Sequence, residues 1–131
     1  MIVADTSAVV EFLLARDELG FRARNVLGGK TVAVPMAIDL ECVAVLRGLV
    51  LGRKVTVVDA EESLETLGQM DLRRMDHSLF MPRVWELRDN MWPYDAIFVA
   101  MAEILDAPLV TTDKKFAGTP GIRCEVRNLR D

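Results

Sequence analysis

Short runs of apolar residues alternate along the chain with longer stretches in which apolar residues recur every three or four positions. The short runs have the length of buried strands, and the longer stretches have the period of helices packed on one side. This alternation is typical of a three-layer α/β/α domain with a mainly parallel central sheet, and we expect residues 1–131 to form one such domain. We predict strands at 1–4, 31–34, 71–76, 108–112 and 122–126. We predict a first helix capped at 6–7 with its core residues at 9–14, and further helices at 17–27, 36–51, 59–70, 78–88 and 94–106.

The segment from Tyr94 to Asp113 brings two acidic residues to one point of this fold. Its helix has little polar surface, so we expect it to be covered on most sides. In an α/β unit the helix begins at the edge of the sheet where the strands end. Asp95 lies in the first helical turn and Asp113 follows the next strand. The two carboxylates are therefore expected at the same edge.

Two further acids reach that edge by the same argument. Asp5 follows the first strand, and Glu41 lies early in the helix after the second strand. Asp39 competes with Glu41, because two helical residues are about 200° apart and cannot both face the site. Taken singly, Asp95 also suits a helix dipole and Asp5 a cap or turn, alongside Thr6 and Ser7, which can cap the first helix. Their coincidence at one edge favours a site.

Four converging carboxylates repel one another and need a counter-charge. At about 5 Å and an effective dielectric of about 20, each pair costs about 3 kcal/mol. Oxygen-only ligands prefer hard cations, so Mg²⁺ or Mn²⁺ is the expected cofactor. Such ions suit phosphodiester hydrolysis by an activated water, leaving a 5′-phosphate and a 3′-hydroxyl. Phosphodiester hydrolysis without a metal ion would need a general base and acid, and His77 is the only histidine.

Four sequence stretches carry a family resemblance that covers essentially the whole chain in order. They are IVADTSA at the start, VP followed by LE, YDAIFVAMAE, and LVTTDKKF. Together they resemble the PIN-domain ribonucleases, and more narrowly the VapC toxins of bacterial and archaeal toxin–antitoxin pairs. The resemblance implies a Mg²⁺- or Mn²⁺-dependent endoribonuclease whose acidic site is Asp5, Glu41, Asp95 and Asp113.

The same resemblance implies further residues and partners. Supporting hydroxyls are expected at Ser7 and Thr111, and alternation along a strand turns Thr111 and Asp113 the same way. An RNA substrate, a cognate antitoxin that blocks the site with a basic segment, and a homodimer are also implied. One departure is that Met91-Trp92-Pro93 stands where such toxins often have Ser or Thr capping the helix.

Composition limits these expectations in two ways. The net charge is −4, from 20 acidic and 16 basic residues, whereas nucleic-acid binders usually carry a basic excess. Acids concentrated around metal ions would offset that argument. The chain has no apolar run long enough for a membrane span, no basic leader and only two cysteines. We therefore expect a cytoplasmic protein with reduced thiols and no membrane partner.

Several residues near the expected site could contact RNA. Lys114, Lys115 and Arg16 could bind phosphates, and Trp92 could stack on a base, with solvated surface or packing as the alternative. Two other functions remain to be distinguished. One is a non-catalytic module whose acidic pocket binds an arginine-bearing partner. The other is a receiver-like signalling domain, although Asp5 lacks the adjacent acid that such a domain needs.

Overall fold

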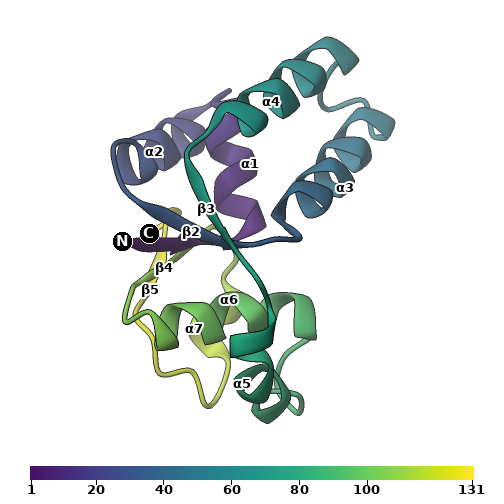
Figure 1. Cartoon of the computed structure of the whole chain (residues 1–131). Helices are drawn as coiled ribbons and strands as arrows, with labels where there is room; N and C mark the ends of the chain where they lie inside the picture. Colours follow the sequence, from purple (N-terminus) through teal and green to yellow (C-terminus); the bar gives the residue numbers. More distant parts are fainter.

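The computed structural model covers residues 1–131 and has a central sheet between two helical layers (Figure 1). All four strand pairings are parallel, and the strand order is β3-β2-β1-β4-β5. The predicted three-layer α/β/α class is confirmed. The strands are β1 (Ile2–Ala4), β2 (Val32–Pro35), β3 (Leu72–Met75), β4 (Leu109–Thr111) and β5 (Val126–Asn128).

The helices divide between the two faces of the sheet (Figure 1). One face carries α1 (Thr6–Leu14), α2 (Glu18–Leu27), α3 (Ile38–Leu51) and α4 (Val57–Gln69). The other carries the 3₁₀ turn η1 (Ser78–Phe80), α5 (Met81–Glu86), α6 (Pro93–Ile104) and α7 (Lys115–Gly118). No helix is both long and apolar enough to cross a membrane.

The core lies on both sides of the three inner strands. Every residue of β1, β2 and β4 is buried, as the continuous apolar runs predict for a parallel sheet. In α6 all residues from Ala96 to Ala102 are buried, which confirms the expected enclosure of this helix. Fully burying an aromatic side chain such as Phe98 contributes roughly 1.5–3 kcal/mol. The core therefore fixes the position of the helix that carries Asp95.

Three elements of the structure differ from the prediction. The last strand is Val126–Asn128 and not 122–126, because the Leu109 N–H pairs with the carbonyl of Glu125 and the ladder begins there. The helix expected at 78–88 is divided into η1 and α5 between Phe80 and Met81, because Pro82 in the first turn of α5 has no N–H to donate back to η1. The four-residue helix α7 was not predicted.

The direction of chain connection reverses at β1. From β1 the chain goes to β2 and β3 on one side, and later to β4 and β5 on the other. In open α/β sheets the crevice beyond the carboxyl ends of the strands at such a switch point is where ligands bind. Ala4 pairs with Val110 in this register, so the residues that follow, Asp5 and Thr111, lie side by side at that edge.

Candidate active site

Asp5 lies at the centre of the edge and is almost fully buried, with 5% of its surface exposed. It is the N-cap of α1, and its Oδ1 accepts hydrogen bonds from the Ala8 N–H at 3.0 Å and the Ser7 hydroxyl at 2.6 Å. The expectation that Thr6 or Ser7 caps this helix is therefore wrong. Asp5 can satisfy the helix end through Oδ1 and still present Oδ2 at the edge.

Two hydroxyls connect Asp5 to the end of β4. Thr111 Oγ1 donates to Asp5 Oδ2 at 2.6 Å and accepts the Asp113 N–H at 2.9 Å. Ser7 Oγ accepts the Thr112 N–H at 3.0 Å while it donates to Asp5. Each hydroxyl thus bridges β1 and β4, and this is the position expected of the supporting residues Ser7 and Thr111.

The environment of Asp5 changes its proton affinity. Burial raises the pKa of Asp5 above its ordinary value, although the hydrogen bonds from Ser7, Thr111 and Ala8 lower it. The negative charge of Asp113 raises it further. A carboxylate kept charged at this position would therefore be stabilised by a cation.

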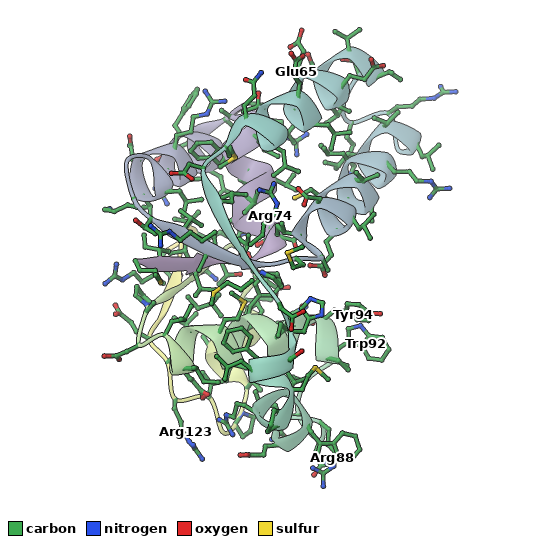
Figure 2. The ribbon with its side chains drawn as sticks, in the orientation of Figure 1. Glu65, Arg74, Arg88, Trp92, Tyr94 and Arg123 are labelled. Atoms are coloured by element: carbon green, nitrogen blue, oxygen red, sulfur yellow. The ribbon has the colours of Figure 1, made fainter.

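Glu41 faces the edge from α3, whereas Asp39 does not. Glu41 Oε2 accepts the Thr6 hydroxyl at 3.1 Å, and burial raises the pKa of Glu41, with the charges of Asp95 and Asp5 adding to the rise. Asp39 instead forms a bidentate pair with Arg74 on β3, at 2.7 and 2.8 Å. Arg74, labelled on β3 in Figure 2, thus engages Asp39, and Glu41 is the acid of α3 that faces the edge. Thr6 had not been assigned to the site, although it adjoins Asp5.

Asp95 and Asp113 form the exposed side of the edge and share one cation. The Lys115 ammonium lies 2.9 Å from Asp95 Oδ2 and 3.1 Å from Asp113 Oδ2. The Lys115 backbone N–H also donates to Asp113 Oδ1 at 3.0 Å. The side chains of Asp95 and Asp113 are 29% and 38% exposed, so this side of the site is open to solvent.

The shared ammonium changes proton affinities on both sides of the contact. Burial alone would raise the pKa of Asp113, but the hydrogen bonds and charge of Lys115 and the charge of Arg130 outweigh it and hold that pKa below its usual range. Burial favours a neutral Lys115, but its hydrogen bonds to both carboxylates outweigh that and raise its pKa. Both groups are therefore held in their charged forms.

The donor chemistry of this edge suits a hard cation. The four acidic side chains offer only oxygen ligands, and a positive group already lies between two of them. As they stand, however, no three acidic, histidine or cysteine side chains lie close enough to enclose a metal ion. Binding an ion would therefore require side-chain rotation around the place that Lys115 takes.

Comparison with known families decides the class of the chain. The family model described as PIN domain matches residues 2–122. The chain belongs to the PIN domain family. Its sequence is 34% identical over 132 residues to Ribonuclease VapC1 of Mycobacterium tuberculosis, covering 98% of this chain and 97% of the relative. A VapC ribonuclease of Mycobacterium bovis is 32% identical, with 96% of each chain covered.

Solved PIN-domain structures share the fold. The FitAcB structure from Neisseria gonorrhoeae has a TM-score of 0.68 at 17% identity, covering 99% of each chain. The M. tuberculosis toxin VapC20 has a TM-score of 0.67 at 17% identity, covering 94% of this chain and 97% of the other. With the ribonuclease relatives, these matches confirm the predicted VapC-type PIN ribonuclease, a class that generally uses divalent metal ions.

Two basic residues besides Lys115 lie beside the acidic edge of the PIN domain. Lys114 and Arg130 border a hollow beside Asp113 together with Ser7, and the Arg130 guanidinium donates to the Thr112 carbonyl at 2.9 Å. Arg130 was not among the predicted residues, because it lies after the last strand and only the fold returns it to this edge.

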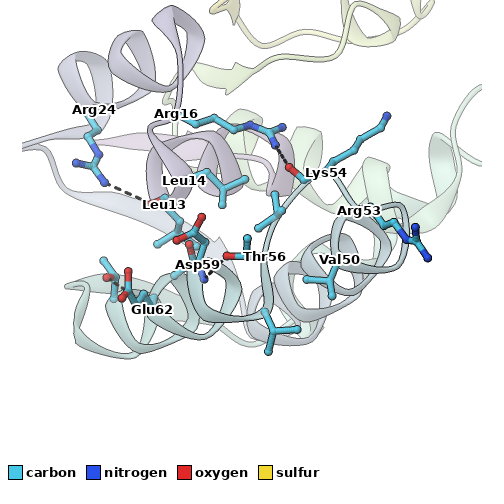
Figure 3. Close-up of a pocket in the computed structure, with 14 residues that line it drawn as sticks. Leu13, Leu14, Arg16, Arg24, Val50, Arg53, Lys54, Thr56, Asp59 and Glu62 are labelled. Carbon is cyan, nitrogen blue, oxygen red and sulfur yellow. Dashed lines mark hydrogen bonds between the residues drawn. The ribbon is translucent and has the colours of Figure 1, made fainter.

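Arg16 does not lie beside these residues. It follows the far end of α1, about 13 Å beyond Asp5 along a nine-residue helix, and donates to the Lys54 carbonyl. There it borders a different hollow, of about 800 Å³, between the first four helices (Figure 3). The expectation that Arg16 lies near the site is therefore corrected.

Two exposed aromatic residues, Trp92 and Tyr94, lie together at the start of α6, the helix that carries Asp95 (Figure 2). Trp92 is the N-cap residue of α6 without a side-chain cap, and it is 66% exposed. Its ring lies 5.8 Å from the half-exposed ring of Tyr94. Tyr94, Glu41 and His77 border a hollow of about 180 Å³. His77 therefore adjoins the acidic edge, a position that its sequence context did not indicate.

Proposed function

We propose that this PIN domain cleaves RNA internally at the acidic edge, as the toxin of a toxin–antitoxin pair. Mg²⁺ or Mn²⁺ would be held by Asp5, Glu41, Asp95 and Asp113, because a site with only oxygen ligands suits both ions. The observation that carries the proposal is that these four carboxylates, from four separate segments, border the switch point between β1 and β4, although no three of them yet lie close enough to enclose an ion.

The protein's own residues divide the work of such a site. Ser7 and Thr111 orient Asp5 through hydrogen bonds of 2.6 Å, and Thr6 orients Glu41. When bound, a divalent ion supplies charge stabilisation at the phosphate and lowers the pKa of a water molecule. Asp95 and Asp113, at the solvent-facing side, are the carboxylates nearest to an arriving phosphodiester.

RNA would approach over the open side of the edge. Lys114 and Arg130, which border the hollow beside Asp113, would pair with backbone phosphates. Trp92 and Tyr94, on the other side, offer exposed rings on which a base can stack. A strand between these two groups would cross the carboxylates, and so local positive and aromatic surface would compensate for the net charge of −4.

The partners follow from the same proposal. Structural neighbours include VapBC of Rickettsia felis and a toxin–antitoxin complex from Klebsiella pneumoniae, with TM-scores of 0.64 and 0.63. By analogy we propose a cognate antitoxin that presents a basic segment to the acidic edge, and a homodimer. The contact of Lys115 with two carboxylates supports this mode of inhibition, because it shows that the edge accommodates a basic side chain. The proposed place of action is the cytoplasm, on cellular RNA.

The test is RNA cleavage by Asp5→Asn, with Asp17→Asn as the matched control. Both aspartates are helix N-caps that accept a backbone N–H three residues on, and Asn caps about as well as Asp. If Asp5 holds the metal ion, Asp5→Asn should lower cleavage by about 100-fold or more. The reason is that losing a residue that only supports a metal ligand already costs about 10- to 100-fold. Asp17→Asn should leave cleavage within about twofold.

Both variants should be assayed with Mn²⁺ and with EDTA, and their folding checked by thermal melting. Wild-type cleavage that persists in EDTA would reject the metal mechanism. Equal cleavage by Asp5→Asn and wild type would reject Asp5 as a catalytic residue and leave it as a cap.

A further inference from the structure

Lys115 differs from the other basic residues around the acidic edge because its ammonium lies between two of the four acidic side chains. It contacts Asp95, from the first turn of α6, at 2.9 Å and Asp113, from the segment after β4, at 3.1 Å. These two contacts join segments that have no other side-chain ion pair between them. Lys114, its neighbour in sequence, forms no ion pair and borders the hollow next to Asp113.

The local backbone holds this lysine in place. The Lys115 N–H donates to Asp113 Oδ1 at 3.0 Å, so Asp113 anchors the start of α7. The ammonium also lies 5.8 Å from the centre of the Phe116 ring, and Phe116 is fully buried. The lysine side chain therefore emerges from a fixed point and reaches the carboxylates without disturbing the core.

The ion pairs of Lys115 with Asp95 and Asp113 hold the two carboxylates near each other, but they are weak enough for a metal ion to replace the ammonium. Lys115 is 49% exposed, and its partners are about one-third exposed. Ion pairs with this much solvent contribute little each, on a scale of about 0–1 kcal/mol. A divalent ion carries twice the charge and accepts more oxygen ligands than an ammonium can bind.

We propose that Lys115 is an internal counterion of the acidic site. Its ammonium holds Asp95 and Asp113 together when no metal is bound, and it has to move away before a divalent ion can use the same oxygens. Lys115 is thus a positioning residue that lowers the apparent metal affinity, because each binding event includes the loss of two ion pairs. This inference rests on the proposed metal site.

The experiment compares Lys115→Met with Lys114→Met, which removes the same charge one residue away. Mn²⁺ binding is measured by the electron paramagnetic resonance signal of free Mn²⁺, and melting temperature is measured in EDTA. Lys115→Met should bind Mn²⁺ about three- to tenfold more tightly than wild type. In EDTA it should melt about 2–4 °C lower, because the carboxylates lose their counterion. Lys115→Arg keeps the positive charge and should stay close to wild type in both measurements.

The possible outcomes separate this inference from the proposed function. Equal Mn²⁺ affinity in wild type, Lys115→Met and Lys114→Met overturns the counterion role and leaves the metal site standing. Equally tighter binding in both methionine variants also overturns it, since it would reflect only the general change in charge. Absence of Mn²⁺ binding in every variant overturns both the metal site and the inference.

Discussion

The two sides of the acidic edge hold their carboxylates by different means. On the buried side, Asp5 is held by two neutral hydroxyls. They donate hydrogen bonds to its oxygens but bring no positive charge to balance its negative one. On the exposed side, Asp95 and Asp113 are held by the charge of Lys115. A buried site cannot accommodate a long, hydrated lysine at low cost, whereas a half-exposed site can.

This difference indicates how the site can hold one carboxylate rigidly and still admit a metal ion. The hydroxyl network sets the position of one carboxylate during folding, because Ser7 and Thr111 belong to the β1–β4 junction. The lysine contact is local and open to solvent, so it can be exchanged without opening the core. Variants on the two sides should therefore differ in their effects on stability, on cleavage and on the response to salt.

The largest expected difference is between Thr111→Val and Thr112→Val. Thr111→Val removes the donor to Asp5 and the acceptor of the Asp113 N–H, so it should cost about 1–3 kcal/mol of stability. It should also lower cleavage by about 10- to 100-fold. Thr112 joins the network only through its backbone N–H and carbonyl, so Thr112→Val keeps these contacts and should change both quantities little. Chemical denaturation and RNA cleavage provide the two measurements, and similar losses in both variants would exclude a specific role for the Thr111 hydroxyl.

A smaller effect should appear in the pH dependence of stability measured in EDTA. Because burial raises the pKa of Asp5, the folded state binds its proton more tightly than the unfolded state does. The contribution of Asp5 to the free energy of unfolding therefore falls as pH rises from its ordinary pKa of 3.8 through the raised value. One group contributes at most about 1.4 kcal/mol per pH unit.

Asp113 has the opposite sign, since its pKa is lowered. Its contribution is present above its ordinary pKa of 3.8 and is lost as pH falls through the folded value. Asp5→Asn should therefore reduce the loss of stability that occurs as pH rises above 3.8. Asp113→Asn should reduce the loss that occurs as pH falls below 3.8. Urea unfolding across the acidic range measures both. The same change in both variants would show that the two sides of the edge are not distinct.

The smallest effect should be the response of these variants to salt. The destabilisation by Lys115→Met in EDTA should shrink in 1 M NaCl, where the Debye length is about 3 Å. The destabilisation by Thr111→Val should not change, since its cause is a buried neutral donor. Melting curves at low and high salt give the comparison, and a salt-independent Lys115→Met effect would mean that the lysine acts by packing.

The local pattern of residues was sufficient to predict most of the fold. Hydrophobic periodicity placed the buried helix α6 and the inner strands, because these signals come from neighbouring residues within one element. The order of strands and acids along the chain then predicted that Asp5, Glu41, Asp95 and Asp113 belong to one edge. That step needed only the fixed direction of chain connection in α/β units.

The sequence by itself thus determined the layers of this protein and the edge at which its acids gather. The tertiary structure decided which side chains pair there: Arg74 draws Asp39 away, Lys115 joins Asp95 to Asp113, and Arg130 returns from the chain end. The physical reason is range. Periodicity depends on residues a few positions apart, whereas each of these contacts depends on the relative placement of elements that only packing of the core brings together.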